Sequence, residues 1–336
     1  MNTYDAAAAR VRRVTVTSPY DGQRIDNFLL RELGATQGTV PRTLIYRILR
    51  TGEVRINSQR AKPTTRVRTG DEIRIPPIKI QAAPSSTLEI PESWLSRVPE
   101  MIVYEDESLL VIDKPAGLAV HGGSGIAFGL IELLRTATQQ GEELELAHRL
   151  DRETSGLILL AKTRTALHAL QTQLRPEGQA EKRYDLIVHG RWPAALQRVE
   201  APLEKWQGDG AAHRVQVTAS GKSAVTHFSC RAQAPQTSLM QAQLHTGRTH
   251  QIRVHAAHVG HPIVGDEKYG QRALDKALGL PERPPLMLHA AQLTLHHPRT
   301  NQAMRFSAPP PASWRAVLTA AGFSSAGLRA LFSPQA

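Results

Sequence analysis

Residues 147–161 read AHRLDRETSGLILLA, so a charged turn runs directly into an apolar segment. The uninterrupted apolar run Leu157–Ala161 predicts a buried strand. In front of this strand, the carboxylate of Asp151 lies between Arg149 and Arg152. Nearby cations favour the ionised form of a carboxylic acid, which is the form that a carboxylate nucleophile requires. The spacing leaves a second interpretation open, in which this aspartate only bonds its own backbone in a polar turn.

A second unusual segment, residues 244–255, reads LHTGRTHQIRVH. Gly247 permits a tight turn, and Thr249 is expected to cap a helix that continues to about Val259. The N-terminus of such a helix favours phosphate, and Arg248 at this entrance would pair with a phosphate or a carboxylate. The alternative interpretation is a surface arginine at the start of a helix.

From about residue 101 onwards the pattern predicts an α+β fold with a mixed, mostly antiparallel sheet, because strands and helices do not alternate strictly. Short apolar runs predict strands at 101–104, 109–112, 157–161, 184–188, 215–217, 239–244 and 293–295. Helical spacing predicts helices at 126–134, at 163–174 with a start signal at Thr163 or Thr165, and at 249–259.

Positive charge is concentrated near the amino terminus. The chain has 41 lysines and arginines against 30 acidic residues, a net charge of +11, and residues 1–80 hold 15 basic against 7 acidic residues. A dense, arginine-rich excess is typical of proteins that bind a nucleic-acid backbone, although a solvated basic surface has the same composition. Aromatic residues make up only 5%, which disfavours a sheet that stacks many bases.

Residues 21–80 have the pattern of a small RNA-binding module with two helices. A first helix is expected to end at Gly34, and a second to run from Thr39 and Pro41 to Gly52. Alternating runs predict short strands at 53–57 and 72–75. The residues that we expect to contact RNA are Arg42, Arg47, Arg50, Arg55, Arg60 and Lys62.

These patterns divide the chain into five parts. We expect a flexible arm at 1–20, the small module at 21–80, a linker at 81–100, a large domain at 101–312 and a tail at 313–336. The linker is expected because proline and serine gather before residue 100.

Several classes of protein are excluded. No apolar run approaches the ~20 residues that a membrane helix needs, and the first residues lack the order of a secretory signal. The lone cysteine, Cys230, forms no intramolecular disulfide, so we expect a reducing, cytoplasmic setting. The fourteen histidines lack the spacing of a metal site, and no phosphate-binding loop or dinucleotide motif is present. We therefore expect neither a metal nor a cofactor.

The motifs resemble those of the RNA pseudouridine synthases, a family that includes enzymes modifying large-subunit ribosomal RNA. The resemblance rests on five segments in family order: LVIDKPAGLAVH (110–121), HRLDRETSGL (148–157), EKRYDLIVHG (181–190), LHTGRTHQIRVHAAHVGHPIVGDEKYG (244–270) and LHAAQLTLHHP (288–298). Residues 22–80 resemble the small αL-type RNA-binding domain named after a ribosomal protein. Within the family, segments 46–57 and 70–77 are most similar to the C-type enzymes.

This resemblance implies an enzyme that isomerises uridines of 23S ribosomal RNA to pseudouridine, as a monomer and without cofactor or metal. Asp151 corresponds to the catalytic aspartate of the family, and Arg149 to the residue that helps to occupy the gap left by the flipped nucleotide. Tyr184 would pack on the target uracil, and Arg248 would form a salt bridge with Asp151. The large domain would be the catalytic domain.

Two other functions remain to be weighed. A non-catalytic RNA-binding protein of ribosome assembly would keep this fold, but the complete set Arg149, Asp151, Tyr184 and Arg248 favours the enzyme. A hydrolase with an aspartate nucleophile would need an activated water or a second carboxylate, and Glu153 is too close in the sequence to be assigned that role.

Overall fold

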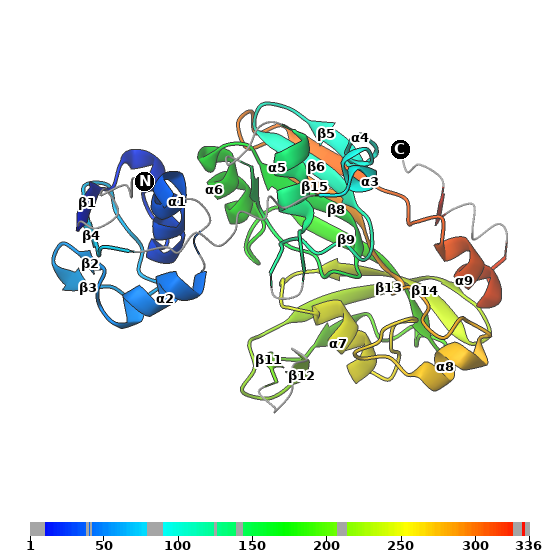
Figure 1. The fold of residues 1–336 in the computed structure, drawn as a ribbon. Helices are drawn as coiled ribbons and strands as arrows, with labels where there is room; N and C mark the ends of the chain where they lie inside the picture. The colour runs from blue at the N-terminus through cyan, green and yellow to red at the C-terminus, as the bar shows by residue number, and fades with distance from the viewer. Residues whose placement is uncertain are drawn as a thin grey trace, which may run out of the picture. The chain divides into compact units, whose positions relative to one another are not determined.

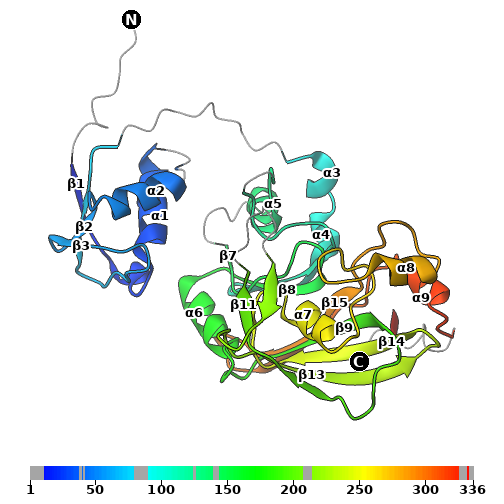
Figure 2. The ribbon, with the colours of Figure 1, turned by 90° about the horizontal axis from the view of Figure 1, so that it is seen from below.

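The structure, a computed structural model, describes residues 11–37, 40, 42–78, 90–123, 126–138, 144–206, 214–324 and 331–332 (Figures 1 and 2). Contacts divide the chain into two units, Met1–Glu89 and Ile90–Ala336, each with its own apolar core.

The described part of the first unit combines two helices with a small antiparallel sheet. Its elements are β1 (Arg12–Thr15), a 3-10 turn (Ser18–Tyr20), α1 (Ile25–Gln37), α2 (Arg42–Arg50), β2 (Arg55–Ile56), β3 (Gln59–Arg60) and β4 (Glu72–Ile75). The strands lie in the order β1-β4-β2-β3. The helices are amphipathic, and Phe28 and Ile45 on their apolar faces share one core with Val67 and Ile73.

Residues 12–20 do not form the expected arm. β1 pairs along its whole length with β4, and Val16, just beyond it, is buried in the core. The strand is short and half-exposed, so its sequence, RRVT, carries no clear strand pattern. Residues 1–10 of the expected arm lie outside the described residues.

The two helices of this unit match their predicted positions in part. α1 continues to Gln37, past the expected end at Gly34, because a glycine inside a helix costs only about 1 kcal/mol. α2 ends as predicted before Gly52, which has the left-handed φ of 73°. Thr39 and Pro41, expected at its start, lie outside the described residues. The predicted strands are confirmed as β2 and β4.

The second unit is built on a ten-stranded mixed sheet. Its strands are β5 (Ile102–Glu105), β6 (Leu109–Lys114), β7 (Glu145–Leu146), β8 (Ser155–Ala161), β9 (Glu181–His189), β10 (Arg198–Glu200), β13 (Val225–Gln233), β14 (Thr237–Leu244), β15 (Leu288–His296) and β16 (Ala303–Ser307). They lie in the order β10-β13-β14-β9-β15-β8-β6-β5, with β16 beside β15 and β7 beside β8. A separate ribbon pairs β11 (Leu203–Lys205) with β12 (Val215–Val217).

The α+β prediction is confirmed, and the sheet is mostly antiparallel. Within the described residues, β8 and β15 form its one parallel pair. At this pair Gly156 has a φ of 104°, and a Cβ there would overlap the backbone of Ala290. Glycine therefore lets the strand that follows Asp151 lie directly against β15.

Strand β8 is buried on both faces, which explains its continuous apolar sequence. Ile158 and Leu160 belong to the core that includes α5 (Leu130–Ala137), whereas Leu157 and Leu159 pack with α6 (Arg164–Gln173). The hydroxyl of Thr163 caps α6 as predicted. Ile126 was expected in α5 but lies before its first residue.

The part of the sheet that contains β13 and β14 is covered by α7 (Gln251–His258). Ile252 and Ala256 of this helix belong to the same apolar cluster as Met240 and Ala242 of β14, and Figures 1 and 2 both show α7 against this part of the sheet. The short helix α8 (Arg272–Ala277) follows it.

The linker predicted at 81–100 includes residues that belong to the second unit. Residues 90–101 form α3 (Glu92–Leu95) and α4 (Val98–Met101), and Val98 and Met101 are buried in the main core. Pro91 and Pro99 lie at the starts of these helices, where proline is tolerated, so their presence does not indicate a linker. Residues 81–89 lie outside the described residues.

The expected tail is also partly folded. Residues Trp314–Ala320 form α9, and Trp314 and Leu318 are buried in the main core. Alanine, which gave this segment its biased composition, is the strongest helix former. Residues 325–330 and 333–336 lie outside the described residues.

A buried histidine joins the central strands of the second unit. His289 of β15 has its Nδ1 2.9 Å from Ser155 Oγ and its Nε2 2.9 Å from the carbonyl oxygen of Ala308. Because a carbonyl only accepts, Nε2 donates to it and the serine hydroxyl donates to Nδ1. Burial lowers the pKa of His289 to about 4, so the ring is uncharged at neutral pH.

The substitution His289→Gln should lower the free energy of unfolding at pH 7 by about 1–3 kcal/mol, because buried partners lose their hydrogen bonds. The difference should shrink as the pH falls from 6.5 towards 4. In that interval the unfolded native chain binds a proton that the folded chain excludes, and the variant has no such group. Urea unfolding followed by tryptophan fluorescence measures this, since all four tryptophans lie in the second unit. A difference that grows on acidification would contradict the assignment.

Candidate active site

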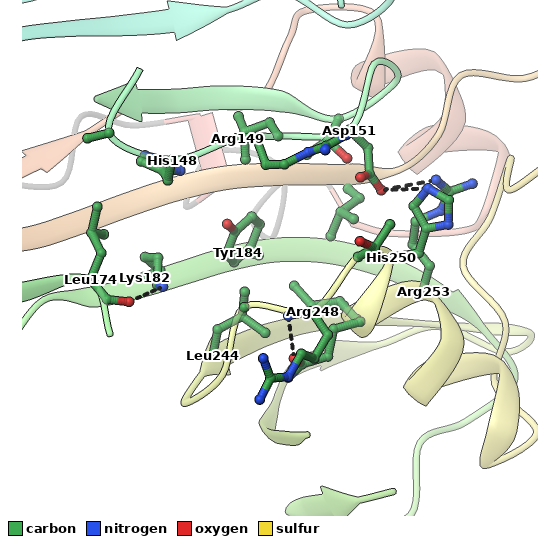
Figure 3. Close-up of a pocket in the computed structure, with 18 of the residues that line it drawn as sticks. His148, Arg149, Asp151, Leu174, Lys182, Tyr184, Leu244, Arg248, His250 and Arg253 are labelled. Atoms are coloured by element: carbon green, nitrogen blue, oxygen red, sulfur yellow. Dashed lines mark hydrogen bonds and ion pairs between the residues drawn. The ribbon is translucent and has the colours of Figure 1, made fainter. Parts of the chain in front are cut away.

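The segment that carries Asp151 and the segment that carries Arg248 meet at a cavity of about 370 Å³ in the second unit (Figure 3). Its walls come from the turn before β8, from β9, from the turn after β14 and from the start of α7. Among the described residues, its lining contains one carboxylate, that of Asp151, and five cations, Arg149, Arg175, Lys182, Arg248 and Arg253. The cavity is therefore suited to a ligand that carries negative charge.

The turn that carries Asp151 is held by the buried side chain of Lys114 at the end of β6. The Nζ of Lys114 donates to the carbonyl oxygens of Pro115 and Leu118 at 2.9 Å and to that of Arg152 at 3.1 Å. All three N–H groups of the ammonium thus have acceptors. Burial lowers the pKa of Lys114 to about 7, although nearby carboxylates favour the charged form. A lysine at the end of an apolar strand is the sequence signal for this role.

The salt bridge to Asp151 comes from Arg253 and not from Arg248, which the family resemblance had indicated. Arg253 Nη1 lies 3.1 Å from Asp151 Oδ2. Its Nε and Nη2 bond both carboxylate oxygens of the buried Asp266, at 2.8 and 2.7 Å. Burial alone lowers the pKa of Arg253, but the hydrogen bonds and charges of Asp266 and Asp151 raise it above its ordinary value. A charged guanidinium therefore joins the two carboxylates.

Arg248 lies at the mouth of the cavity, where its exposed guanidinium donates from Nε to the carbonyl oxygen of Ser223 at 3.1 Å. The helix that follows, α7, begins at Gln251, later than predicted. Its N-cap is His250, in a left-handed conformation with φ of 54°, and not Thr249. Arg253 consequently lies in the first turn of the helix and reaches Asp151, whereas Arg248 lies in the preceding turn.

His250 makes a second, longer contact with Asp151. Its Nε2 lies 3.7 Å from Asp151 Oδ2, and its Nδ1 shares a 2.6 Å hydrogen bond with the hydroxyl of Tyr269. Burial lowers the pKa of His250 to about 4, and the charge of Asp151 offsets this only in part. Tyr269 also accepts the backbone N–H of Val215 at 2.9 Å, which connects the β11–β12 ribbon to the site. Both residues fall inside the quoted motif 244–270, but their roles depend on contacts that no spacing reveals.

Tyr184 lies on β9 within the cavity lining, between Asp151 and Lys182 in the view of Figure 3. Burial, with a smaller contribution from the charge of Asp151, raises the pKa of Tyr184 above its ordinary value, so the side chain stays an uncharged phenol. Its ring offers a flat surface to a planar ligand. Arg149 is exposed at the edge of the cavity. The structure thus brings Arg149, Asp151, Tyr184 and Arg248 to one cavity.

This arrangement offers one carboxylate to a bound ligand. Glu153 is exposed and pairs with Arg152 at 3.4 Å, and within the described residues it does not line the cavity. Glycoside hydrolysis usually requires two carboxylates that flank the bond, so the hydrolase alternative lacks its second group here. In the described parts of the chain, no three metal-ligating side chains gather. Of the helices described, none has the length and apolar character to cross a membrane.

The basic residues expected to contact RNA lie in the first unit. Arg47 and Arg50 are exposed in the last turn of α2. Arg60 donates to the carbonyl oxygen of Thr51, in the turn after α2, at 3.1 Å. It faces Arg55 across the β2–β3 pair. Like charges in facing positions destabilise a sheet, so their proximity favours an anionic ligand. The two remaining expected contacts are Lys62, which is exposed, and Arg42, whose side chain is outside the description.

Comparison with known proteins gives a consistent result. Residues 108–258 match the family described as RNA pseudouridylate synthase. The chain is 42% identical over 310 residues to the ribosomal large subunit pseudouridine synthase C of Pasteurella multocida (strain Pm70), covering 92% of this chain and 94% of the relative. It is 43% identical over 304 residues to the protein of the same name in Escherichia coli (strain K12), covering 89% and 93%.

A solved structure shares the fold. The human RNA pseudouridylate synthase domain containing 4 superposes with a TM-score of 0.56 at 28% identity, covering 68% of this chain and 95% of that chain.

The assignment of the salt bridge predicts different effects for the two arginines. Arg253→Met should lower the free energy of unfolding by about 3–5 kcal/mol, because it leaves the buried carboxylate of Asp266 unpaired. Arg248→Met should change it by less than about 0.5 kcal/mol, because that side chain is exposed. Adding Asp266→Leu to the Arg253 variant should recover part of the loss. Urea unfolding measures all three, and equal effects of the two arginine substitutions would refute the assignment.

Proposed function

Because the chain belongs to the RNA pseudouridylate synthase family, whose members are isomerases, we propose that it converts uridines of large-subunit (23S) ribosomal RNA to pseudouridine, with Asp151 as the catalytic carboxylate. The proposed substrate follows from the relatives in Pasteurella multocida and Escherichia coli, which are named for the ribosomal large subunit. We propose that it acts as a monomer, as the family resemblance implies.

One observation carries the proposal. The carboxylate of Asp151 is paired with Arg253 at 3.1 Å and lines a cavity that it shares with the ring of Tyr184. A uracil stacked on that ring would place its ribose within reach of a single, oriented carboxylate. The other charges in the lining are cationic, which suits the phosphates of an RNA strand.

The reaction needs little more than this. The bond between uracil N1 and ribose C1′ breaks, the ring turns, and a bond forms between C5 and C1′. The proton on C5 is released and N1 gains a proton, so the overall reaction is an isomerisation without a change of oxidation state. Two routes use one carboxylate: Asp151 removes a ribose proton to give a glycal, or it attacks the sugar or the base and leaves again. Either route is compatible with the single carboxylate of the cavity.

The uridine must leave the base stack to reach this carboxylate, at a cost of a few kcal/mol. Arg149, at the edge of the cavity, would enter the gap that the nucleotide leaves. Tyr184 would pack against the extruded uracil. Arg248, which is not the partner of Asp151, would contact the RNA at the mouth of the cavity.

The substitution Asp151→Asn should reduce isomerisation by at least about 100-fold, because asparagine keeps the shape but neither accepts a proton nor attacks carbon. RNA affinity should stay close to that of the native chain. Tritium release from RNA with C5-labelled uridine measures the reaction, and filter binding measures affinity. Glu153→Gln is the matched control, since it removes an exposed carboxylate two residues away and should leave activity intact. Activity of the Asn variant within tenfold of native would remove Asp151 from the catalytic role.

We further propose that the first unit supplies RNA affinity and targeting. Its excess of arginine, the exposed Arg47 and Arg50, and the facing pair of Arg55 and Arg60 all favour contact with phosphates. The resemblance of residues 22–80 to αL-type domains supports the same role. The energy of this binding would offset the cost of extruding the uridine.

A fragment starting at Ile90 should fold, because the main core of the second unit begins with that residue. It should bind ribosomal RNA more weakly. The slope of log affinity against log salt should fall by about 0.7–0.9 for each phosphate contact that is lost. The full chain with Arg47→Gln and Arg50→Gln should change in the same direction by a smaller amount. Unchanged affinity together with an unchanged slope would show that the basic residues form only a solvated surface.

A further inference from the structure

The cavity continues past Tyr184 to a second end that the proposed chemistry does not use. Figure 3 shows Tyr184 between Asp151 on one side and Lys182 on the other. Lys182 and Tyr184 lie two residues apart on β9, so their side chains project from the same face of the strand, about 6–7 Å apart along it. Arg175 and Arg248 line the same cavity, whereas its one described carboxylate is that of Asp151.

Among the described residues, the ammonium of the half-buried Lys182 has fewer partners than a buried cation normally has. Its described contact is a long one, 3.5 Å from Nζ to the carbonyl oxygen of Leu174. Burial lowers the pKa of Lys182, and no neighbouring carboxylate offsets this effect. Lys114 provides the comparison within the same chain, because its buried ammonium donates to three carbonyl oxygens within 3.1 Å. All three N–H donors of Lys114 therefore have acceptors in the fold, whereas Lys182 has N–H donors available to bind a ligand.

The space beside this ammonium is bordered by bare backbone. A Cβ at Gly247 would lie 4.0 Å from Lys182 Nζ, so the absence of a side chain there leaves room next to the charge. Arg175 and Arg248 are both exposed, and in the described residues neither forms a salt bridge with an acid. Arg175 and Arg248 directly follow Leu174 and Gly247, which border this ammonium. Three cations for which the described residues provide no carboxylate partner thus line the same cavity.

We propose that Lys182, with Arg175 and Arg248, forms an anion subsite that binds a phosphodiester next to the target uridine. The inference rests on the proposed function, because the phosphate belongs to the RNA whose uridine is isomerised. Uracil is uncharged, so the phosphates are the groups of RNA that such cations attract. Charge-assisted hydrogen bonds between cation and phosphate are also stronger than bonds to a neutral carbonyl. A phosphate held here fixes the RNA backbone on one side of Tyr184 while Asp151 acts on the other side.

Stability and affinity should respond in opposite directions to the loss of this charge. Lys182→Met keeps the approximate length of the side chain and removes an ammonium whose described contact is one long hydrogen bond to a carbonyl oxygen. The variant should therefore unfold at the same or a higher temperature than the native chain. Its affinity for a stem-loop of large-subunit ribosomal RNA containing a mapped target uridine should fall about 10- to 100-fold.

Arg183→Met is the matched control. It removes one positive charge from the adjacent residue of β9, whose side chain projects from the opposite face and pairs with Glu181 at 3.1 Å. This variant should bind the stem-loop with an affinity close to that of the native chain.

The decisive measurement replaces single phosphodiesters on the 5′ and 3′ sides of the target uridine by uncharged methylphosphonates. One of these replacements should weaken binding by about 10-fold or more for the native chain and for Arg183→Met. The same replacement should have no further effect on Lys182→Met. Equal losses in all three proteins at both linkages would overturn the subsite, and so would a melting temperature of Lys182→Met several degrees below native. Tritium release from the unmodified RNA is a separate readout: its absence beside phosphate-dependent binding would count against the proposed reaction and not against the subsite.

Discussion

The guanidinium of Arg253 is the point at which the parts of the site are joined. It pairs with Asp151, which lines the cavity, and with the buried Asp266. Each of the three groups needs the others, because a buried charge without a partner is costly. The position of the Asp151 carboxylate is therefore set by a buried network and not by the turn alone. Lys114 fixes the backbone of that turn through its hydrogen bond to the carbonyl oxygen of Arg152. Gly156 lets the following strand lie against β15. Together these contacts leave Asp151 little freedom before any ligand arrives.

The sheet explains why the cavity lies where it does. One half, centred on β8, is covered by helices on both faces and has an apolar sequence. The other half, with β13 and β14, is covered by α7. Asp151 precedes a strand of the first half, Arg253 lies on the helix of the second half, and Tyr184 lies on β9 between them. The cavity thus forms where the halves meet, and both must be in place for it to exist.

Features that depend on neighbours in sequence were predicted well, and features that depend on distant contacts were not. The buried strand β8, the Thr163 cap and the stop at Gly52 are local, and all three are confirmed. The strand β1 and the helix α9 owe their structure to β4 and to the main core, so their composition alone suggested an arm and a tail. The partner of Asp151 was misassigned because the family resemblance was carried over to Arg248, whereas the observed contact with Arg253 joins residues 102 positions apart and depends on the fold.

The distance along the chain between Asp151 and Arg253, 102 residues, has a consequence for synthesis. At about 5–20 residues per second, the carboxylate leaves the ribosome roughly 5–20 seconds before its partner. β15, which lies between β8 and β9, follows later still. During that interval the nascent chain already carries its whole basic first unit, but the pair of Asp151 and Arg253 has not yet formed. If the two units act as proposed, the part that binds RNA is therefore complete before the site, and the site forms only when the nearly complete chain has closed its sheet.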